Sequence, residues 1–173
     1  GLTVITGLWT SNALATPPQK VPLMRAQLAQ MLDSLQLDAK GHAGKSLVHA
    51  MTHLPHDVMI GFPAEEQQRV ALTAVSLFDR PRPKLLLLRS PLRRHVFAFV
   101  WLPRDDVSTG MRHAIAEMLT TEAKASILAW SIALEDGQVA LIRFTLDLTD
   151  RDVALDETAL DAKLKRLVRG WAP

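Results

Sequence analysis

The chain has 173 residues, of which 48% are hydrophobic and 22% charged, and it carries a formal net charge of +2. This composition is typical of a folded domain with its own core, and it excludes wholesale disorder. Because the chain has no cysteine, disulfides, thiol catalysis and thiolate metal sites are excluded. The small excess of positive charge does not by itself indicate nucleic-acid binding.

The first half of the chain predicts one strand followed by helices. The strand is expected over residues 2–9, which are rich in β-branched and apolar residues, and Pro17-Pro18 predicts a loop after it. Apolar residues then recur at helical spacing in three segments bounded by prolines. The expected helices cover residues 22–35, 45–53 and 64–78.

A proline-rich connector follows the last of these helices. The run Arg80-Pro-Arg-Pro83 cannot stay helical, so we place the boundary between two domains there. Residues 1–79 are expected to form the N-terminal strand and helical segment, and residues 84–173 an α+β module.

The second half predicts the element order ββαββα. The expected strands cover residues 84–89, 95–102, 125–134 and 139–148, and the expected helices cover residues 108–121 and 156–171. Asp105 or Asp106 is expected to cap the first of these helices, and Asp136-Gly137 predicts the turn between the last two strands. Four strands with both helices on one face make a two-layer α+β sandwich, of the ferredoxin-like plan or a permuted relative of it.

A phosphate-loop pattern is the first candidate for chemistry. Residues 39–46, AKGHAGKS, place Gly44, Lys45 and Ser46 at the diagnostic positions. The strict pattern requires glycine where Ala39 stands, and the loop should follow a buried strand, whereas the preceding segment has helical spacing. We therefore interpret it as a turn between helices in which Gly41 and Gly44 supply positive φ, with ATP binding as a lesser alternative.

Four histidines, at positions 42, 49, 53 and 56, form the second candidate. His49 and His53 lie one helical turn apart, which is a usable spacing for metal ligands. The glutamate of the HExxH motif is missing, because Ala50 follows His49, and Asp57 is the nearby carboxylate. We expect packed or exposed histidines and no metal site.

Basic residues around the predicted hairpin form the third candidate. Arg89, Arg93, Arg94 and Arg104 are the candidate residues for an anion site or a subunit interface. The alternative is that these charges keep a strand edge from pairing with other chains. A stand-alone basic module that binds nucleic acid is the competing hypothesis for the whole chain, although Phe97 and Phe99, its candidate stacking residues, also fit the core.

No stretch reaches the roughly 20 apolar residues of a membrane span, and no signal peptide precedes the first elements. The chain begins at Gly1 without methionine and stops at Pro173, directly after a predicted helix. We interpret it as part of a longer protein. No dinucleotide fingerprint and no Ser-His-Asp order is present, so no catalytic or cofactor-binding residue is assigned.

Three collinear segments resemble the N-terminal region of the large bacterial NAD-specific glutamate dehydrogenases. The first joins Gly7-Leu-Trp-Thr-Ser11 to Val21-Pro-Leu-Met-Arg25, the second runs from His42 to Asp57, and the third joins residues 85–89 to residues 97–105. Their order and spacing agree across nearly the whole chain. The sequence departs from the family at His56, where arginine is usual, and in the turn of residues 90–94, which lacks the customary aromatic residue and glycine.

The resemblance implies a non-catalytic regulatory and assembly part of such an enzyme, in which residues 84–173 form an ACT-like module. The whole enzyme would oxidatively deaminate L-glutamate to 2-oxoglutarate and ammonium in the cytoplasm, with NAD bound by a domain far downstream. The expected partners are other domains and subunits of the same enzyme and a small amino-acid effector, because ACT-type modules pair across subunits and bind amino acids there. Nucleic acid and membranes are not expected partners.

Overall fold

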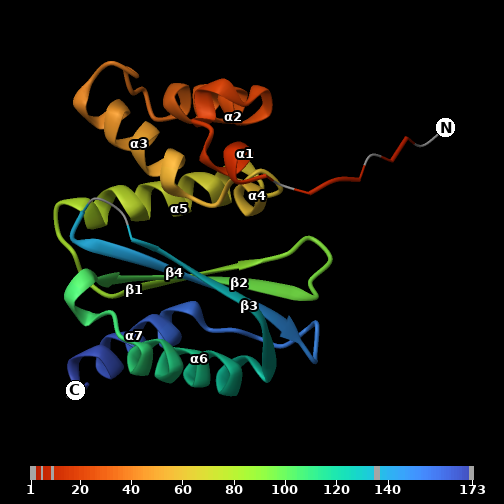
Figure 1. Cartoon of the computed structure of the whole chain (residues 1–173), viewed down its shortest axis with the longest axis vertical. Helices are drawn as coiled ribbons and strands as arrows, with labels where there is room; N and C mark the ends of the chain where they lie inside the picture. Colours follow the sequence, from red (N-terminus) through yellow and green to blue (C-terminus); the bar gives the residue numbers. More distant parts are fainter. Residues whose placement is uncertain (1–2, 5, 9, 135–136, 172–173) are drawn as a thin grey trace. The chain divides into compact units, whose positions relative to one another are not determined.

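The computed structural model describes residues 3–4, 6–8, 10–134 and 137–171 of the chain. It divides into two compact units, residues 1–75 and residues 76–173. The division falls inside the third predicted helix, a few residues before the proline-rich connector. Figure 1 shows the elements of each unit.

The first unit is helical. Its elements are α1 (Ser11–Ala15), the 3-10 helix η1 (Pro18–Lys20), α2 (Pro22–Ser34), α3 (His42–His53), α4 (His56–Met59) and most of α5 (Ala64–Phe78). The three predicted helices correspond to α2, α3 and α5. The short elements α1, η1 and α4 fall where we expected loop, since helices of three to five residues have too few apolar positions to show a period.

The expected strand over residues 2–9 is not found at its described residues, which have no regular secondary structure. Residues 2, 5 and 9 lie outside the described part of the chain. β-branched composition favours a strand only where a neighbouring strand supplies hydrogen bonds, and no strand of the described chain pairs with this segment.

Local chemistry accounts for both ends of α2. Pro22 occupies its first turn, where the missing N–H leaves no hydrogen bond unmade. Met24, Leu28 and Met31 form its buried stripe. The helix ends with Gln36 in the left-handed region, at φ 53°, and the Leu37 N–H donates to the Leu32 carbonyl at 2.9 Å. This pairing is the Schellman motif, which satisfies carbonyls at a helix end.

The second unit contains a four-stranded antiparallel sheet with two helices. Its further elements are β1 (Lys84–Arg89), β2 (His95–Pro103), the 3-10 helix η2 (Arg104–Asp106), α6 (Thr109–Ala123), β3 (Ala125–Leu134), β4 (Val139–Leu148) and α7 (Glu157–Arg169). The strand order is β1-β2-β4-β3. This order is that of a circularly permuted ferredoxin-like sheet, so the predicted α+β, ββαββα fold is confirmed.

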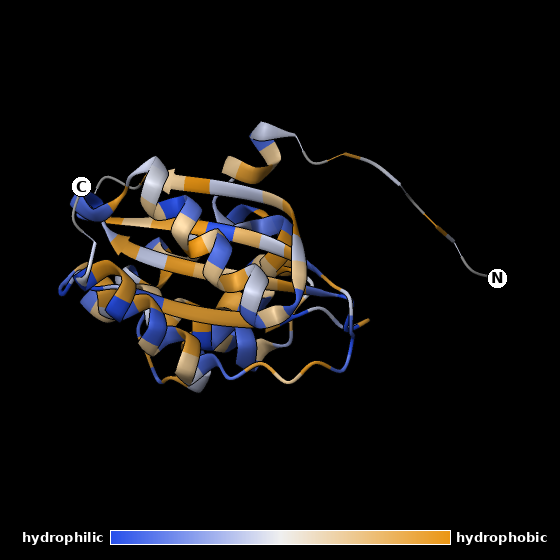
Figure 2. Cartoon of the chain, turned by 90° about the horizontal axis from the view of Figure 1, so that it is seen from below, coloured by the Kyte–Doolittle hydropathy of each residue, from blue (hydrophilic) through white to orange (hydrophobic). Residues whose placement is uncertain are grey.

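The core of this unit lies between the sheet and the pair α6 and α7. Alternate residues of β2 and β4, including Val100, Ile142 and Phe144, pack in one cluster with Ile115 of α6 and Leu164 of α7. Period-2 alternation of the strands and helical spacing on α6 and α7 bring these side chains together. Figure 2 shows the hydrophobic colouring of the strands and the mixed faces of the helices.

One detail of the second unit differs from expectation. The cap of α6 is Ser108, whose hydroxyl accepts from the Met111 N–H, whereas Asp105 and Asp106 form η2. Ser108 is adjacent to the first helical residue, which is where a side chain can reach the free N–H groups. β3 and β4 pair antiparallel as predicted, although Asp136 in the turn between them lies outside the described residues.

Candidate functional site

The two edges of the sheet differ in how their backbone groups are used. At the β1 edge, the Leu85 N–H donates to Asp161 Oδ1 and the Leu87 N–H donates to Glu157 Oε2, each at 2.8 Å. Glu157 and Asp161 are four residues apart on α7, so both carboxylates project from one face of that helix. These carboxylates occupy outward-facing N–H groups of β1, where a further strand would otherwise pair.

Asp161 is a buried carboxylate with several partners. Its Oδ2 lies 2.7 Å from Lys165 Nζ and 3.4 Å from Lys84 Nζ. Burial by itself raises the pKa of Asp161, but the hydrogen bonds from Lys165 and Leu85 and the charge of Lys84 outweigh it, so this pKa lies below its ordinary value. The ionised carboxylate therefore holds α7 against β1.

The predicted basic residue Arg89 lies against the segment between β4 and α7, and Arg94 lies beside the end of β4. The Arg89 guanidinium donates to the backbone carbonyls of Arg151 and Val153. Arg94 Nε donates to Asp147 Oδ1 at 3.0 Å, and this hydrogen bond raises the pKa of Arg94 and lowers that of Asp147. Both arginines thus have partners inside this unit.

Arg93 and Arg104, the other two predicted site residues, are exposed. Arg93 lies 3.4 Å from Asp152, and both side chains are largely exposed to solvent, so this ion pair contributes little stability. The backbone N–H of Arg104 donates to the Gln138 carbonyl. The four arginines contact different partners along the hairpin, and their role in binding an anion or a partner subunit stays a prediction.

No carboxylate of the described residues covers the β3 edge in this way. Within the described chain β3 pairs with β4 alone, and its ten residues, ASILAWSIAL, contain no charge, proline or glycine. Four of its five large side chains are exposed: Leu128 by 56%, Trp130 by 49%, Ile132 by 39% and Leu134 by 55%. A long, uncharged and apolar edge strand is a template for pairing with another chain.

The apolar side chains of β3 extend the pairing surface beyond the backbone. Trp130 and Ile132 lie opposite Phe144 and Ile142 of β4, which belong to the core on the helix side of the sheet. The Arg112 guanidinium of α6 lies 4.2 Å from the centre of the Trp130 ring, a cation–π contact that fixes the indole at the rim of the patch. Exposed patches of this kind mark interaction surfaces.

The phosphate-loop pattern lies at the start of α3, after a turn that follows helix α2. The Ser46 hydroxyl donates to the His42 carbonyl of its own helix. The expected positive φ at Gly41 and Gly44 is wrong, because no described glycine has one. Gly44 is required by contact instead: a Cβ on it would lie 2.0 Å from the Asp38 backbone oxygen.

The four predicted histidines do not converge. The rings of His49 and His53 are 4.1 Å apart, and His53 Nδ1 donates to the His49 carbonyl at 2.8 Å. His42 is exposed and His56 is buried. Among residues 3–171, apart from those not described, no three histidine or carboxylate side chains come close enough to hold a metal ion.

Sequence reasoning found the β3 strand but not its exposure. Its apolar run was equally compatible with a buried central strand, because the residue pattern of a single strand does not determine where that strand lies in the sheet. The absence of charges across ten residues was the available signal, since natural edge strands usually carry them.

Comparison with known proteins agrees with these two units. A family model described as glutamate dehydrogenase, ACT2 domain, matches residues 84–172. A second model, described as glutamate dehydrogenase, helical motif 1, matches residues 21–80. None of the described helices is long and apolar enough to cross a membrane.

Three curated relatives of the chain are all named NAD-specific glutamate dehydrogenase. The chain is 28% identical over 166 residues to an NAD-specific glutamate dehydrogenase of Halomonas elongata, and this match covers 95% of the chain. It is 25% identical over 166 residues to the protein of that name from Pseudomonas aeruginosa. A third, from Mycobacterium tuberculosis, is 22% identical over 86% of the chain. The chain spans about a tenth of the length of these relatives, at 9–10% of each.

Proposed function

Because the chain belongs to the glutamate dehydrogenase family, as its ACT2 and helical motif 1 domains, we propose that it is a non-catalytic assembly and regulatory module of an NAD-dependent glutamate dehydrogenase. The whole enzyme converts L-glutamate to 2-oxoglutarate and ammonium and reduces NAD. NAD belongs to the whole enzyme, and other domains of that enzyme are partners of this chain. The proposal includes a cytoplasmic location, since the relatives are bacterial and named for NAD.

The observation that carries the assembly role is the contrast between the two edges of the sheet. α7 carboxylates occupy the edge at β1, while β3 leaves eight of its ten uncharged residues exposed. In the proposed assembly, β3 of one subunit pairs antiparallel with β3 of a second subunit about a two-fold axis. Such pairing satisfies the outer backbone groups of β3 and buries Leu128, Trp130 and Leu134. An amino-acid effector would act by binding more tightly to the paired state.

The non-catalytic part of the proposal is tested with the isolated chain. We expect no NADH to form when the chain is incubated with L-glutamate and NAD, because no dinucleotide-binding fold or catalytic lysine is assigned to it. Absorbance at the NADH band measures this, with an intact glutamate dehydrogenase as the positive control. Glutamate-dependent NADH formation by the purified chain would contradict the proposal.

The assembly part is tested by charging the β3 edge. Leu134→Lys places a charge on the edge strand, where pairing would bury it, so we expect self-association to weaken by about tenfold or more. Leu92→Lys is the matched control, because Leu92 is 82% exposed in the β1–β2 turn and lies off the β3 edge. Sedimentation equilibrium measures both. Equal association of the two variants would exclude pairing through β3.

A further inference from the structure

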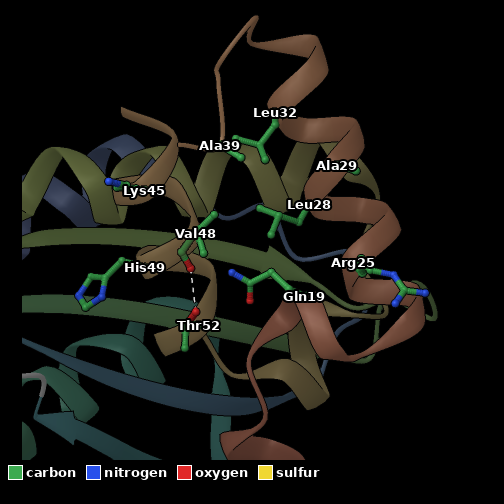
Figure 3. Close-up of a pocket in the computed structure, with 10 residues that line it drawn as sticks. All are labelled: Gln19, Arg25, Leu28, Ala29, Leu32, Ala39, Lys45, Val48, His49 and Thr52. Atoms are coloured by element: carbon green, nitrogen blue, oxygen red, sulfur yellow. Dashed lines mark hydrogen bonds between the residues drawn. The ribbon is translucent and has the colours of Figure 1, made fainter. Parts of the chain in front are cut away.

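A pocket of about 570 Å³ lies in the helical unit, between α2 and α3. Its volume is within the range of about 300–1,000 Å³ that is common for small-molecule sites. Its centre is apolar, with Leu28 and Leu32 from α2 and Val48 from α3. Figure 3 shows these three side chains between the two helices, with Gln19 beside them. The proposed assembly through β3 makes no use of this pocket.

Basic groups surround the apolar centre. Arg25 comes from α2, and Lys45 and His49 come from α3. In Figure 3 these three side chains lie at opposite margins of the pocket, Arg25 on one side and Lys45 and His49 on the other. Neither the Arg25 nor the Lys45 side chain has a hydrogen bond or ion pair with another residue in the described part of the chain.

Among the described residues, none of those that line the pocket is a carboxylate. Its ten residues are three basic, two neutral polar and five apolar, namely Arg25, Lys45, His49, Gln19, Thr52, Leu28, Ala29, Leu32, Ala39 and Val48. The Thr52 hydroxyl already donates to the Val48 carbonyl at 2.8 Å. A ligand with a negative group finds positive partners at the margin, whereas a ligand ammonium group finds no countercharge.

We propose that this pocket binds a small organic carboxylate with an apolar body and without an α-ammonium group. The body lies on Leu28, Leu32 and Val48, where its burial drives binding. The carboxylate lies at the margin and pairs with Arg25 or Lys45. The pocket thus selects carboxylic or 2-oxo acids over the corresponding amino acids, and this selection is independent of the proposed assembly through β3.

The ligand class is tested by NMR titration of the whole 173-residue chain with three matched compounds. 4-Phenylbutanoate has the apolar body and the carboxylate, 4-phenylbutan-1-ol lacks the charge, and L-homophenylalanine adds the ammonium group. We expect 4-phenylbutanoate to shift the amides of α2 and α3, and the other two to bind about two- to fivefold more weakly. Equal or tighter binding of the alcohol or the amino acid would overturn the proposal, as would shifts confined to the second unit.

The site is tested with charge-removing variants. Arg25→Gln or Lys45→Gln should weaken 4-phenylbutanoate binding by about two- to fivefold, because exposed ion pairs are worth little individually. Arg166→Gln removes the same charge from an exposed position on α7 in the other unit and should leave the affinity unchanged. Both pocket residues are exposed, so the variants should keep the amide spectrum of the folded chain. Unchanged affinity in the Arg25→Gln, Lys45→Gln double variant would overturn the assignment.

Discussion

At the scale of single residues, a close contact between backbones explains Gly44. This glycine lies in the first turn of α3, where its Cα faces the turn that leads out of α2. A Cβ at this position would lie 2.0 Å from the Asp38 carbonyl oxygen and 2.8 Å from the Asp38 carbonyl carbon. Backbone atoms cannot rotate away as a side chain can, so the turn and the helix would have to separate.

Gly44→Ala is therefore expected to destabilise the chain by about 1–3 kcal/mol or more, the cost of overpacking. Gly61→Ala is the matched control, because the nearest atom to its added Cβ would be 3.8 Å away. Urea unfolding followed by circular dichroism measures both changes. Equal unfolding midpoints for the two variants would contradict this explanation. A phosphate-binding Gly44 would instead show a loss of ATP affinity with the stability of the ligand-free chain unchanged.

Individual residue roles were the least predictable part of the chain. The sequence pattern indicated that glycine is needed at position 44, but it predicted positive φ as the reason. In the structure the described residues with positive φ are Gln36, Arg93 and Lys124. Whether a side chain caps a helix or forms a turn depends on the local backbone geometry of a few residues. For this reason the cap of α6 could be Ser108, in place of the expected Asp105 or Asp106, without any change in the hydrophobic pattern.

At the scale of elements, α7 is tied to β1 by charge as well as by packing. Asp161 accepts the Leu85 N–H and pairs with Lys84 and Lys165. Because the pKa of Asp161 is lower in the folded chain than its ordinary value, its stabilising contribution is present at neutral pH. That contribution is lost as the pH falls through the pKa of the folded state.

Asp161→Asn keeps a hydrogen-bond acceptor for Leu85 but removes the charge. We expect a loss of about 1–3 kcal/mol in the free energy of unfolding at pH 7, and a difference from wild type that narrows below about pH 4. Asp152→Asn is the control, because its ion pair with Arg93 is exposed. Urea unfolding at pH 7, 5 and 3 measures these effects. A difference that is the same at pH 3 and pH 7 would show that the charge of Asp161 is not its cause.

Elements were largely predictable because their signals are periodic. The four strands of the sheet and the helices α2, α3, α5, α6 and α7 lie within a few residues of their predicted positions. The order of the strands was not predictable from any single strand, since it depends on long-range packing. The asymmetry between a carboxylate-covered β1 edge and an open β3 edge therefore emerged only from the structure.

At the scale of the whole molecule, the chain belongs to the glutamate dehydrogenase family, and the geometry of its sheet supports the proposed assembly role. The matched segments of glutamate dehydrogenase are its ACT2 domain and helical motif 1, and the chain spans about a tenth of its relatives. The resemblance was predictable from collinear motifs across the chain. The two surfaces proposed for interaction, the β3 edge and the pocket between α2 and α3, were not, because both depend on which side chains remain exposed after folding.

Concentration-dependent hydrogen exchange of the whole chain tests pairing through β3 most directly. In the proposed assembly, amides of β3 that point away from β4 exchange rapidly in dilute solution and slowly when subunits pair. The Leu85 and Leu87 amides, already bonded to Asp161 and Glu157, should be protected at every concentration. Leu134→Lys should abolish the concentration dependence. Exchange in β3 that stays rapid at concentrations where the chain self-associates would contradict the central claim.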